Sequence, residues 1–182
     1  MQTPAELLVS FRGILLLARG RAEGAALLPA SLEGARRSFW VAVLCLPIFL
    51  LLDSSFTTSP RAAVASLTGY VVGWPAYALA ALAVCRSLGR EALWPRLVAT
   101  WNWSNLLQYL IMLAITLFSV MPLPAWTQEV ITIAGIGYAL WLQWFAARSA
   151  LQVSGVTAAG FIVLDLVLSL LVSGVVTDLA RS

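Results

Sequence analysis

The residue of this 182-residue chain that is best suited to take part in chemistry is an aspartate inside a long apolar segment. Asp165 stands in the middle of the run FIVLDLVL. A carboxylate at the centre of a bilayer costs about 2.5–3.5 kcal/mol on insertion scales, so such groups face a protein interior, become neutral or find a partner. Two interpretations are open. One is a proton or cation relay, or a polar contact to a partner subunit; the other is a neutral acid hydrogen-bonded to a neighbouring side chain.

A second polar group begins another apolar segment, in a stretch that reads WNWSNLLQY. Asn102, Asn105 and Tyr109 are spaced i, i+3 and i+7, so they share one helix face, and Gln108 lies beside it. Amides in lipid hydrogen-bond between helices, worth about 0.6–2 kcal/mol each, and this structural role is the favoured interpretation. The functional alternative is a polar vestibule that opens to the cytoplasm and is shared with Gln143.

Small residues and prolines indicate how the helices pack. Two steps of the small-xxx-small type let helices approach closely. The helix-packing candidates are Gly69, Gly73, Ser169 and Ser173. Pro47 and Pro75 fall in the middle of apolar segments, where each removes a backbone donor and is expected to kink its helix.

The residues that most enzyme mechanisms need are missing from the composition. The chain has no histidine, and all 11 of its basic residues are arginine. A serine or cysteine nucleophile normally needs a histidine or lysine base, and no glycine-rich phosphate loop occurs. Cys45 and Cys85 have no ligand-type residues close in sequence and are interpreted as small apolar packing residues. We therefore expect no enzyme activity, no metal site and no cofactor.

The composition places these residues in a membrane. The chain is 61% hydrophobic and 10% charged, whereas soluble domains carry about 25% charged residues. Five apolar stretches reach the roughly 17–25 residues that a helix needs to cross a bilayer. The predicted fold class is therefore all-α, a polytopic membrane protein with five transmembrane helices. The predicted spans are 38–56, 62–85, 98–120, 130–147 and 154–177.

The arginines set the predicted orientation, because they alternate between the loops. One side carries Arg12, Arg19, Arg21, Arg36, Arg37, Arg86, Arg90, Arg96 and Arg148, and the other carries Arg61 and Arg181. The positive-inside rule places the N-terminus in the cytoplasm and the C-terminus outside, as an odd number of spans requires. Because the arginines lie at the ends of apolar segments, the net charge of +3 does not indicate a nucleic-acid partner.

Residues 1–37 are predicted to form a cytoplasmic segment, and residues 38–182 the helix bundle. One helix face in the N-terminal segment carries Leu7, Leu8, Phe11, Ile14, Leu15 and Ala18. This stripe predicts an amphipathic helix that lies in the inner membrane interface. The equally weighted alternative is a cap that packs under the bundle.

Tryptophans near the ends of the predicted spans are expected at the headgroup level, where indole rings are favoured. Those near the cytoplasmic ends are Trp40, Trp94, Trp101, Trp103 and Trp144. Trp126 lies near the outer end of a span.

Two stretches resemble the Yip family of Ypt-interacting membrane proteins, and especially its small bacterial members. They read GARRSFW at 34–40 and WNWSNLLQ at 101–108, within a layout of a cytoplasmic N-terminal segment, five close spans and almost no C-terminal tail. The resemblance covers about Glu33 to Asp178. It implies a non-enzymatic integral membrane protein that works through partners or lipid. The Asp-Leu-Tyr-Gly-Pro motif of the eukaryotic members is absent, so their role with small GTPases is not carried over.

Two functional hypotheses follow. The first is a scaffold or accessory subunit of the bacterial inner (cytoplasmic) membrane. Its partners would be the lipid bilayer and other membrane proteins or itself, contacted through the glycine and serine faces and Asp165. The alternative is a small transporter or channel component in which Asp165, with Asn105 and Gln108, lines a polar or proton path.

Overall fold

A computed structural model describes residues 4–54 and 58–181, and every regular element within them is a helix. The elements are α1 (Pro4–Ala18), η1 (Ala22–Leu27), α2 (Leu32–Ser38), α3 (Trp40–Leu52), α5 (Pro60–Ser87), η2 (Glu91–Leu93), α6 (Trp94–Ser119), α7 (Ala125–Leu151) and α8 (Gly155–Arg181). The prediction of an all-α fold is confirmed. Pro47 lies inside α3 and Pro75 inside α5, and both helices continue through their proline.

Within the described residues, four helical segments are long and apolar enough to cross a membrane, one fewer than predicted. They are Leu32–Leu52, Pro60–Ser87, Ala125–Leu151 and Gly155–Ala180. The predicted span 98–120 falls in α6, which has 26 residues but begins with a run of indole and amide side chains that reduces its hydropathy. The predicted span 38–56 begins earlier, at Leu32, and the helix ends at Leu52; residues 55–56 lie outside the described part of the chain.

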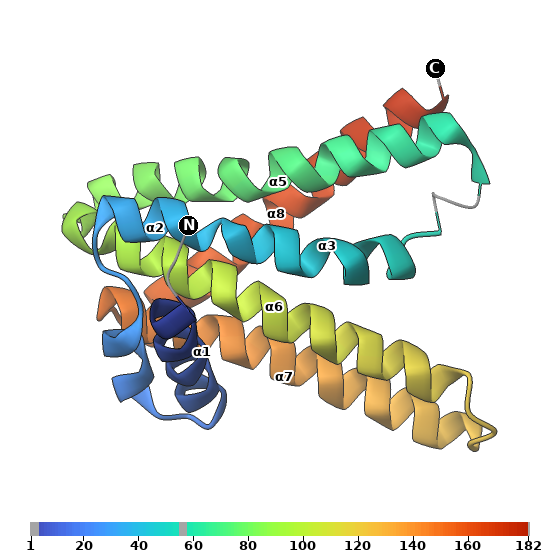
Figure 1. The fold of residues 1–182 in the computed structure, drawn as a ribbon, viewed down its shortest axis with the longest axis horizontal. Helices are drawn as coiled ribbons and strands as arrows, with labels where there is room; N and C mark the ends of the chain where they lie inside the picture. The colour runs from blue at the N-terminus through green and yellow to red at the C-terminus, as the bar shows by residue number, and fades with distance from the viewer. Residues whose placement is uncertain (1–3, 55–57, 182) are drawn as a thin grey trace.

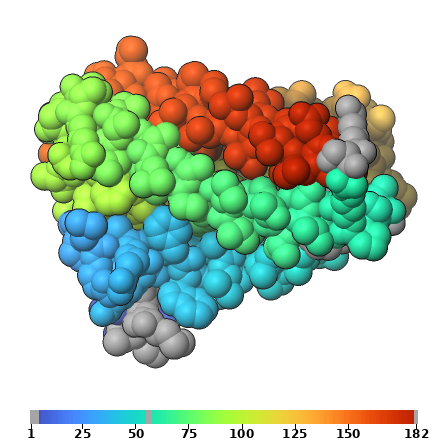
Figure 2. Space-filling view, turned by 90° about the horizontal axis from the view of Figure 1, so that it is seen from above, coloured from blue at the N-terminus to red at the C-terminus, as the bar shows by residue number. Residues whose placement is uncertain are grey.

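The long helices form two pairs that share one end. α6 packs along α7 as a hairpin, and α5 packs along α8. The two pairs converge near α1 and diverge toward the C-terminus (Figure 1). Seen from above, α5 lies between α8 and the α2–α3 segment (Figure 2). The molecule is therefore closely packed at one end and splayed at the other.

The buried core is concentrated at the converging end. Its fully buried members come from most of the helices: Ile14, Leu17, Val41, Cys45, Tyr77, Cys85, Leu97, Leu142, Leu151 and Phe161. Exposed apolar side chains dominate the splayed half of α6, α7 and α8. Such an apolar surface suits hydrocarbon as a solvent better than water.

The helix α1 packs under the converging end, against η1, α6 and α7. It buries Ile14 and Leu17, whereas Leu8 and Phe11 are 69% and 38% exposed. The predicted stripe is therefore divided, because it includes the buried Ile14 as well as the exposed Leu8 and Phe11. The physical reason is that α1 is apolar on almost every side, so its periodicity does not select one face. Close approach of η1 at Gly13 makes the choice instead.

Specific contacts fix α1 beneath the bundle. The Tyr138 hydroxyl on α7 donates to the carbonyl oxygen of Ala18 over 2.6 Å. The Phe11 and Trp103 rings have centroids 6.3 Å apart. A cap under the bundle, one of the two arrangements predicted for this segment, is the arrangement observed.

Two of the tryptophans assigned to the headgroup level lie in the protein interior. Trp101 and Trp103 are only 8% and 2% exposed, so their indoles face protein neighbours and not open headgroups. Both indoles pack against neighbouring helices of the core instead. Trp40 and Trp126 are exposed, which is compatible with the predicted headgroup position.

The contact between α1 and η1 requires a residue without a Cβ atom at Gly24, and this requirement can be tested. A Cβ atom on Gly24 would lie 2.3 Å from the Gly13 carbonyl oxygen and 2.9 Å from the Leu17 nitrogen. Backbone atoms cannot turn aside as side chains do, so Gly24→Ala should lower the free energy of unfolding by about 1–3 kcal/mol.

Thermal unfolding of the detergent-solubilised protein, followed by circular dichroism, measures this loss. Gly137→Ala on α7 is the matched control, since no heavy atom lies within 4 Å of its added Cβ. Equal melting temperatures for the two variants would contradict the described packing of α1 on η1.

Candidate functional site

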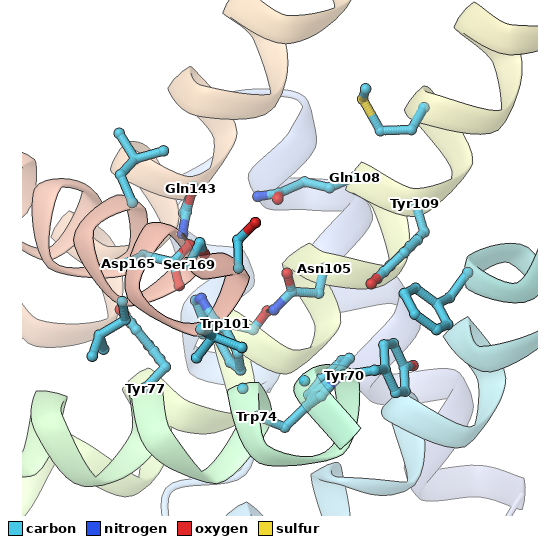
Figure 3. A pocket seen from close by; sticks show the side chains of 18 of the residues that line it. Tyr70, Trp74, Tyr77, Trp101, Asn105, Gln108, Tyr109, Gln143, Asp165 and Ser169 are labelled. Carbon is cyan, nitrogen blue, oxygen red and sulfur yellow. Dashed lines mark hydrogen bonds between the residues drawn. The ribbon is translucent and has the colours of Figure 1, made fainter. Parts of the chain in front are cut away.

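A cavity of about 510 Å³ opens where the two helix pairs diverge, and most of the predicted polar residues line it. The predicted polar residues that line it are Asp165, Asn105, Gln108 and Gln143, and the four predicted helix-packing residues, Gly69, Gly73, Ser169 and Ser173, line it as well. They come from α5, α6, α7 and α8, and their side chains gather around one space (Figure 3). The volume falls in the range of about 300–1,000 Å³ that is typical of small-molecule sites.

The carboxyl group of Asp165 is held by an amide from the facing helix. Gln143 Nε2 on α7 donates to Asp165 Oδ2 on α8 over 2.6 Å. Gln143 itself is 5% exposed, so the bond lies at the buried base of the cavity. An amide donor lowers the cost of keeping a carboxylate away from water. It adds no positive charge.

Trp101 supplies a second N–H group at this base. Its indole reaches from α6 toward Asp165 (Figure 3). Among the described residues, however, the buried Nε1 atom completes no hydrogen bond. A buried donor left without an acceptor costs about 1–3 kcal/mol. This N–H is therefore available to an acceptor that enters the cavity, or to Asp165 after a small movement.

Aromatic side chains form much of the remaining wall, and sequence reasoning placed only Tyr109 among them on the predicted polar face. They are Phe49, Tyr70, Trp74, Tyr77, Trp101 and Tyr109. Tyr77 stacks on Trp101 with ring centroids 4.3 Å apart, and Trp74 meets Trp101 edge-on at 5.3 Å. The spacing of Tyr70, Trp74 and Tyr77 by four and three residues was a usable signal, because it places all three on one helix face.

Asn102 lies outside this cavity, although its spacing predicted a face shared with Asn105 and Tyr109. It is fully buried, and its Nδ2 donates to Ser38 Oγ over 2.7 Å. The Ser38 hydroxyl donates in turn to the Ala35 carbonyl oxygen over 2.6 Å. Asn102 therefore joins α6 to α2, while Asn105 and Tyr109 face the cavity.

The two glycines of α5 have different surroundings. A Cβ on Gly69 would lie 2.5 Å from Val176 Cγ2, so α5 and α8 touch closely at this point. A Cβ on Gly73 would meet no heavy atom within 4 Å, because the cavity begins there. Ser169 and Ser173 on α8 are exposed and line the same space.

The cavity is closed toward the arginine-rich loops and open toward the other end. Thr100, Leu142 and Phe161 are buried beneath it, whereas Ser169 and Ser173 are exposed at its far side. The predicted vestibule opened toward the arginine-rich side, and the structure differs because α1 and the tryptophans of α6 fill that end.

No protein-family model, curated protein or solved structure matches this chain, so its function is argued from the cavity. Within residues 4–54 and 58–181, no group of three or more histidine, cysteine, aspartate or glutamate side chains is placed to hold a metal ion.

The bond between Gln143 and Asp165 should show as energetic coupling. The variants Gln143→Ala and Asp165→Ala, alone and combined, form a double-mutant cycle in which the interaction energy is about 0.6–2 kcal/mol. Unfolding of the protein from mild detergent by increasing mole fractions of sodium dodecyl sulfate measures each term.

The control for this cycle is Gln128→Ala, a glutamine change on the same helix. Its amide donates to the Met121 carbonyl oxygen at the opposite end of α7. Its effect should add to that of Asp165→Ala. Coupling of equal size in both cycles would contradict a specific Gln143–Asp165 bond.

Proposed function

We propose that this chain is a small membrane transporter or channel component that admits a solute to the cavity around Asp165. The observation that carries the proposal is convergence: polar residues far apart in sequence meet in one space of about 510 Å³. Ionisable groups at membrane depth mark solute or ion pathways by default. The proposed role is non-enzymatic, with no cofactor.

The scaffold hypothesis has weaker support from the geometry. It required the small-residue faces and Asp165 to point outward, toward another protein. Instead, Gly73, Ser169 and Asp165 line the cavity, and Gly69 contacts α8 of the same chain. Asp165 and Gly69 are therefore engaged within the protein itself, and Gly73 and Ser169 face the cavity.

The proposal includes α6 as a fifth span. The helix has 26 residues and packs along α7, which is apolar and long enough to cross a membrane. A helix paired along its length with a spanning helix must occupy the same depth. Its polar side chains are directed into the cavity or toward α2 and do not need to meet lipid.

The proposed orientation of the protein in the membrane follows from the distribution of the arginines between the loops, under the positive-inside rule. We place the N-terminus in the cytoplasm and the C-terminus outside, in the inner membrane of a bacterium, in keeping with the resemblance to small bacterial Yip-like proteins. In this orientation the cavity opens to the outside and is closed toward the cytoplasm.

The N-terminal helix also fits an interfacial position. Leu8, Val9 and Arg12 are exposed on α1, and Arg19, directly after the helix, is exposed as well. Exposed apolar side chains beside arginines suit the boundary between headgroups and acyl chains. We propose that α1 contacts lipid with this face while its other face caps the bundle.

Reporter fusions test the number of spans. With five spans, alkaline phosphatase fused after residue 182 should be active, and green fluorescent protein at the same site should be dark. Both reporters fused before residue 1 should give the opposite result. Because four spans would place both termini on one side, fluorescence from both ends would remove α6 from the spanning set.

Thiol labelling tests whether water reaches the cavity. In a background carrying Cys45→Ala and Cys85→Ala, Ser169→Cys should react with a charged, membrane-impermeant thiosulfonate added outside intact cells. Leu170→Cys is the matched control, since Leu170 is 72% exposed on the same helix and faces away from the cavity. Thiosulfonates react with thiolates, which form in water and not in hydrocarbon.

Labelling of Ser169→Cys from outside, with protection of Leu170→Cys, is the expected outcome. In inside-out vesicles the cavity thiol should react at least about tenfold more slowly. Protection of Ser169→Cys in both preparations would exclude the outward-open aqueous path.

A further inference from the structure

The cavity holds a carboxyl group beside which the described part of the protein places no basic side chain. Asp165 is bonded by the neutral amide of Gln143, and the described residues that line the cavity include no arginine. The chain as a whole has no lysine and no histidine. Charges removed from water are normally paired, so the missing positive charge belongs on the guest.

The aromatic wall favours the same sign of charge. The faces of indole and phenol rings are negative, and cations within about 6 Å of a ring centroid are attracted to them. Tyr70, Trp74 and Tyr109 line the cavity together with the stacked pair Tyr77 and Trp101. Rings arranged beside a single carboxylate are typical of sites for ammonium groups that carry carbon substituents.

The rest of the lining indicates an apolar body on the guest. Leu140, Leu166 and Val172 face the cavity, and its volume of about 510 Å³ exceeds what one inorganic ion fills. The described lining offers one carboxylate, which balances one positive charge and not the two of a divalent metal ion. Entry from the open side passes Ser66, whose hydroxyl donates to the carboxylate of Asp53 and so sets a second acid near the mouth.

We infer that the cavity binds a monovalent organic cation with an apolar body, with its ammonium group between Asp165 and the aromatic wall. This inference rests on the proposed function, since it names the class of solute that enters the same cavity. Gln143 is a positioning residue, because it holds the carboxyl through Oδ2 and leaves Oδ1 outside this bond.

Isothermal titration calorimetry on the full-length protein in a maltoside detergent tests the charge requirement. The probes are benzyltrimethylammonium, its neutral carbon isostere neopentylbenzene, and benzenesulfonate. The cation should bind at least about tenfold more tightly than either of the others, a difference of about 1.4 kcal/mol, because only the cation is attracted to both the carboxylate and the ring faces. Equal affinity for the cation and its neutral isostere would overturn the inference.

Matched variants separate the carboxylate from its surroundings. Asp165→Asn should weaken binding of the cation about tenfold or more and leave binding of neopentylbenzene unchanged. Asp178→Asn, the same change at an exposed site on α8 outside the cavity, should leave both unchanged. Unaltered affinity of Asp165→Asn for the cation would overturn the inference.

The aromatic wall has its own test. Trp74→Leu should weaken cation binding about threefold to thirtyfold, while Trp74→Phe retains most of it, since a ring face suffices. Where Trp74→Leu fails to fold, Tyr109→Leu and Tyr109→Phe make the same comparison. Identical affinities for the leucine and phenylalanine variants would contradict cation–π binding.

Two further measurements distinguish a lipid headgroup from a free amine as the ligand, and failure of this inference from failure of the proposed function. Displacement of benzyltrimethylammonium by a short-chain phosphatidylcholine assigns the site to a lipid headgroup, and no displacement assigns it to a free amine. Outside labelling of Ser169→Cys without preference for the cation would overturn this inference and leave the aqueous path intact. Loss of that labelling would overturn the proposed function itself.

Discussion

The rest of this structure depends on how one carboxyl group, that of Asp165, is kept away from lipid. The described residues around it include no basic side chain that could pair with it. Asp165 stands on α8, the most apolar of the candidate spanning helices. Its cost in hydrocarbon is too large to leave uncompensated. The helices therefore surround it with neutral groups: the amide of Gln143, the indole of Trp101 and the polar face of α6. A cavity at this position is the direct result.

The same constraint explains why the molecule is packed so unevenly. A carboxylate that needs a polar space cannot lie in a core closed at both ends. The chain meets this need by packing one end tightly, with α1 and η1 beneath it, and by letting the two helix pairs separate beyond Gly73. Gly69 marks a close contact of α5 with α8 on the open side. Tight packing at one end holds the polar groups at the base in position.

Sequence reasoning predicted the helices and several cavity residues, because long apolar segments are easy to recognise and the few polar residues inside them are conspicuous. It failed where every side of a helix is apolar. On α1, periodicity selected Leu8 and Phe11, whereas contacts with η1 bury Leu17. On α6, Asn102 and Asn105 were placed on one face, yet 300° of rotation over three residues leaves room for one to face α2 and the other the cavity. In a membrane, hydrophobicity does not distinguish a lipid neighbour from a protein neighbour.

The modest hydropathy of α6 has a consequence for how the protein is made. This helix leaves the ribosome before α7, and its amides and indoles gain their partners only when the neighbouring helices are present. The turn between α6 and α7 is short, and Gln128 clamps it by donating to the Met121 carbonyl oxygen. We therefore expect α6 and α7 to enter the bilayer together as a hairpin. The favourable insertion of the apolar α7 then compensates for the less favourable insertion of α6.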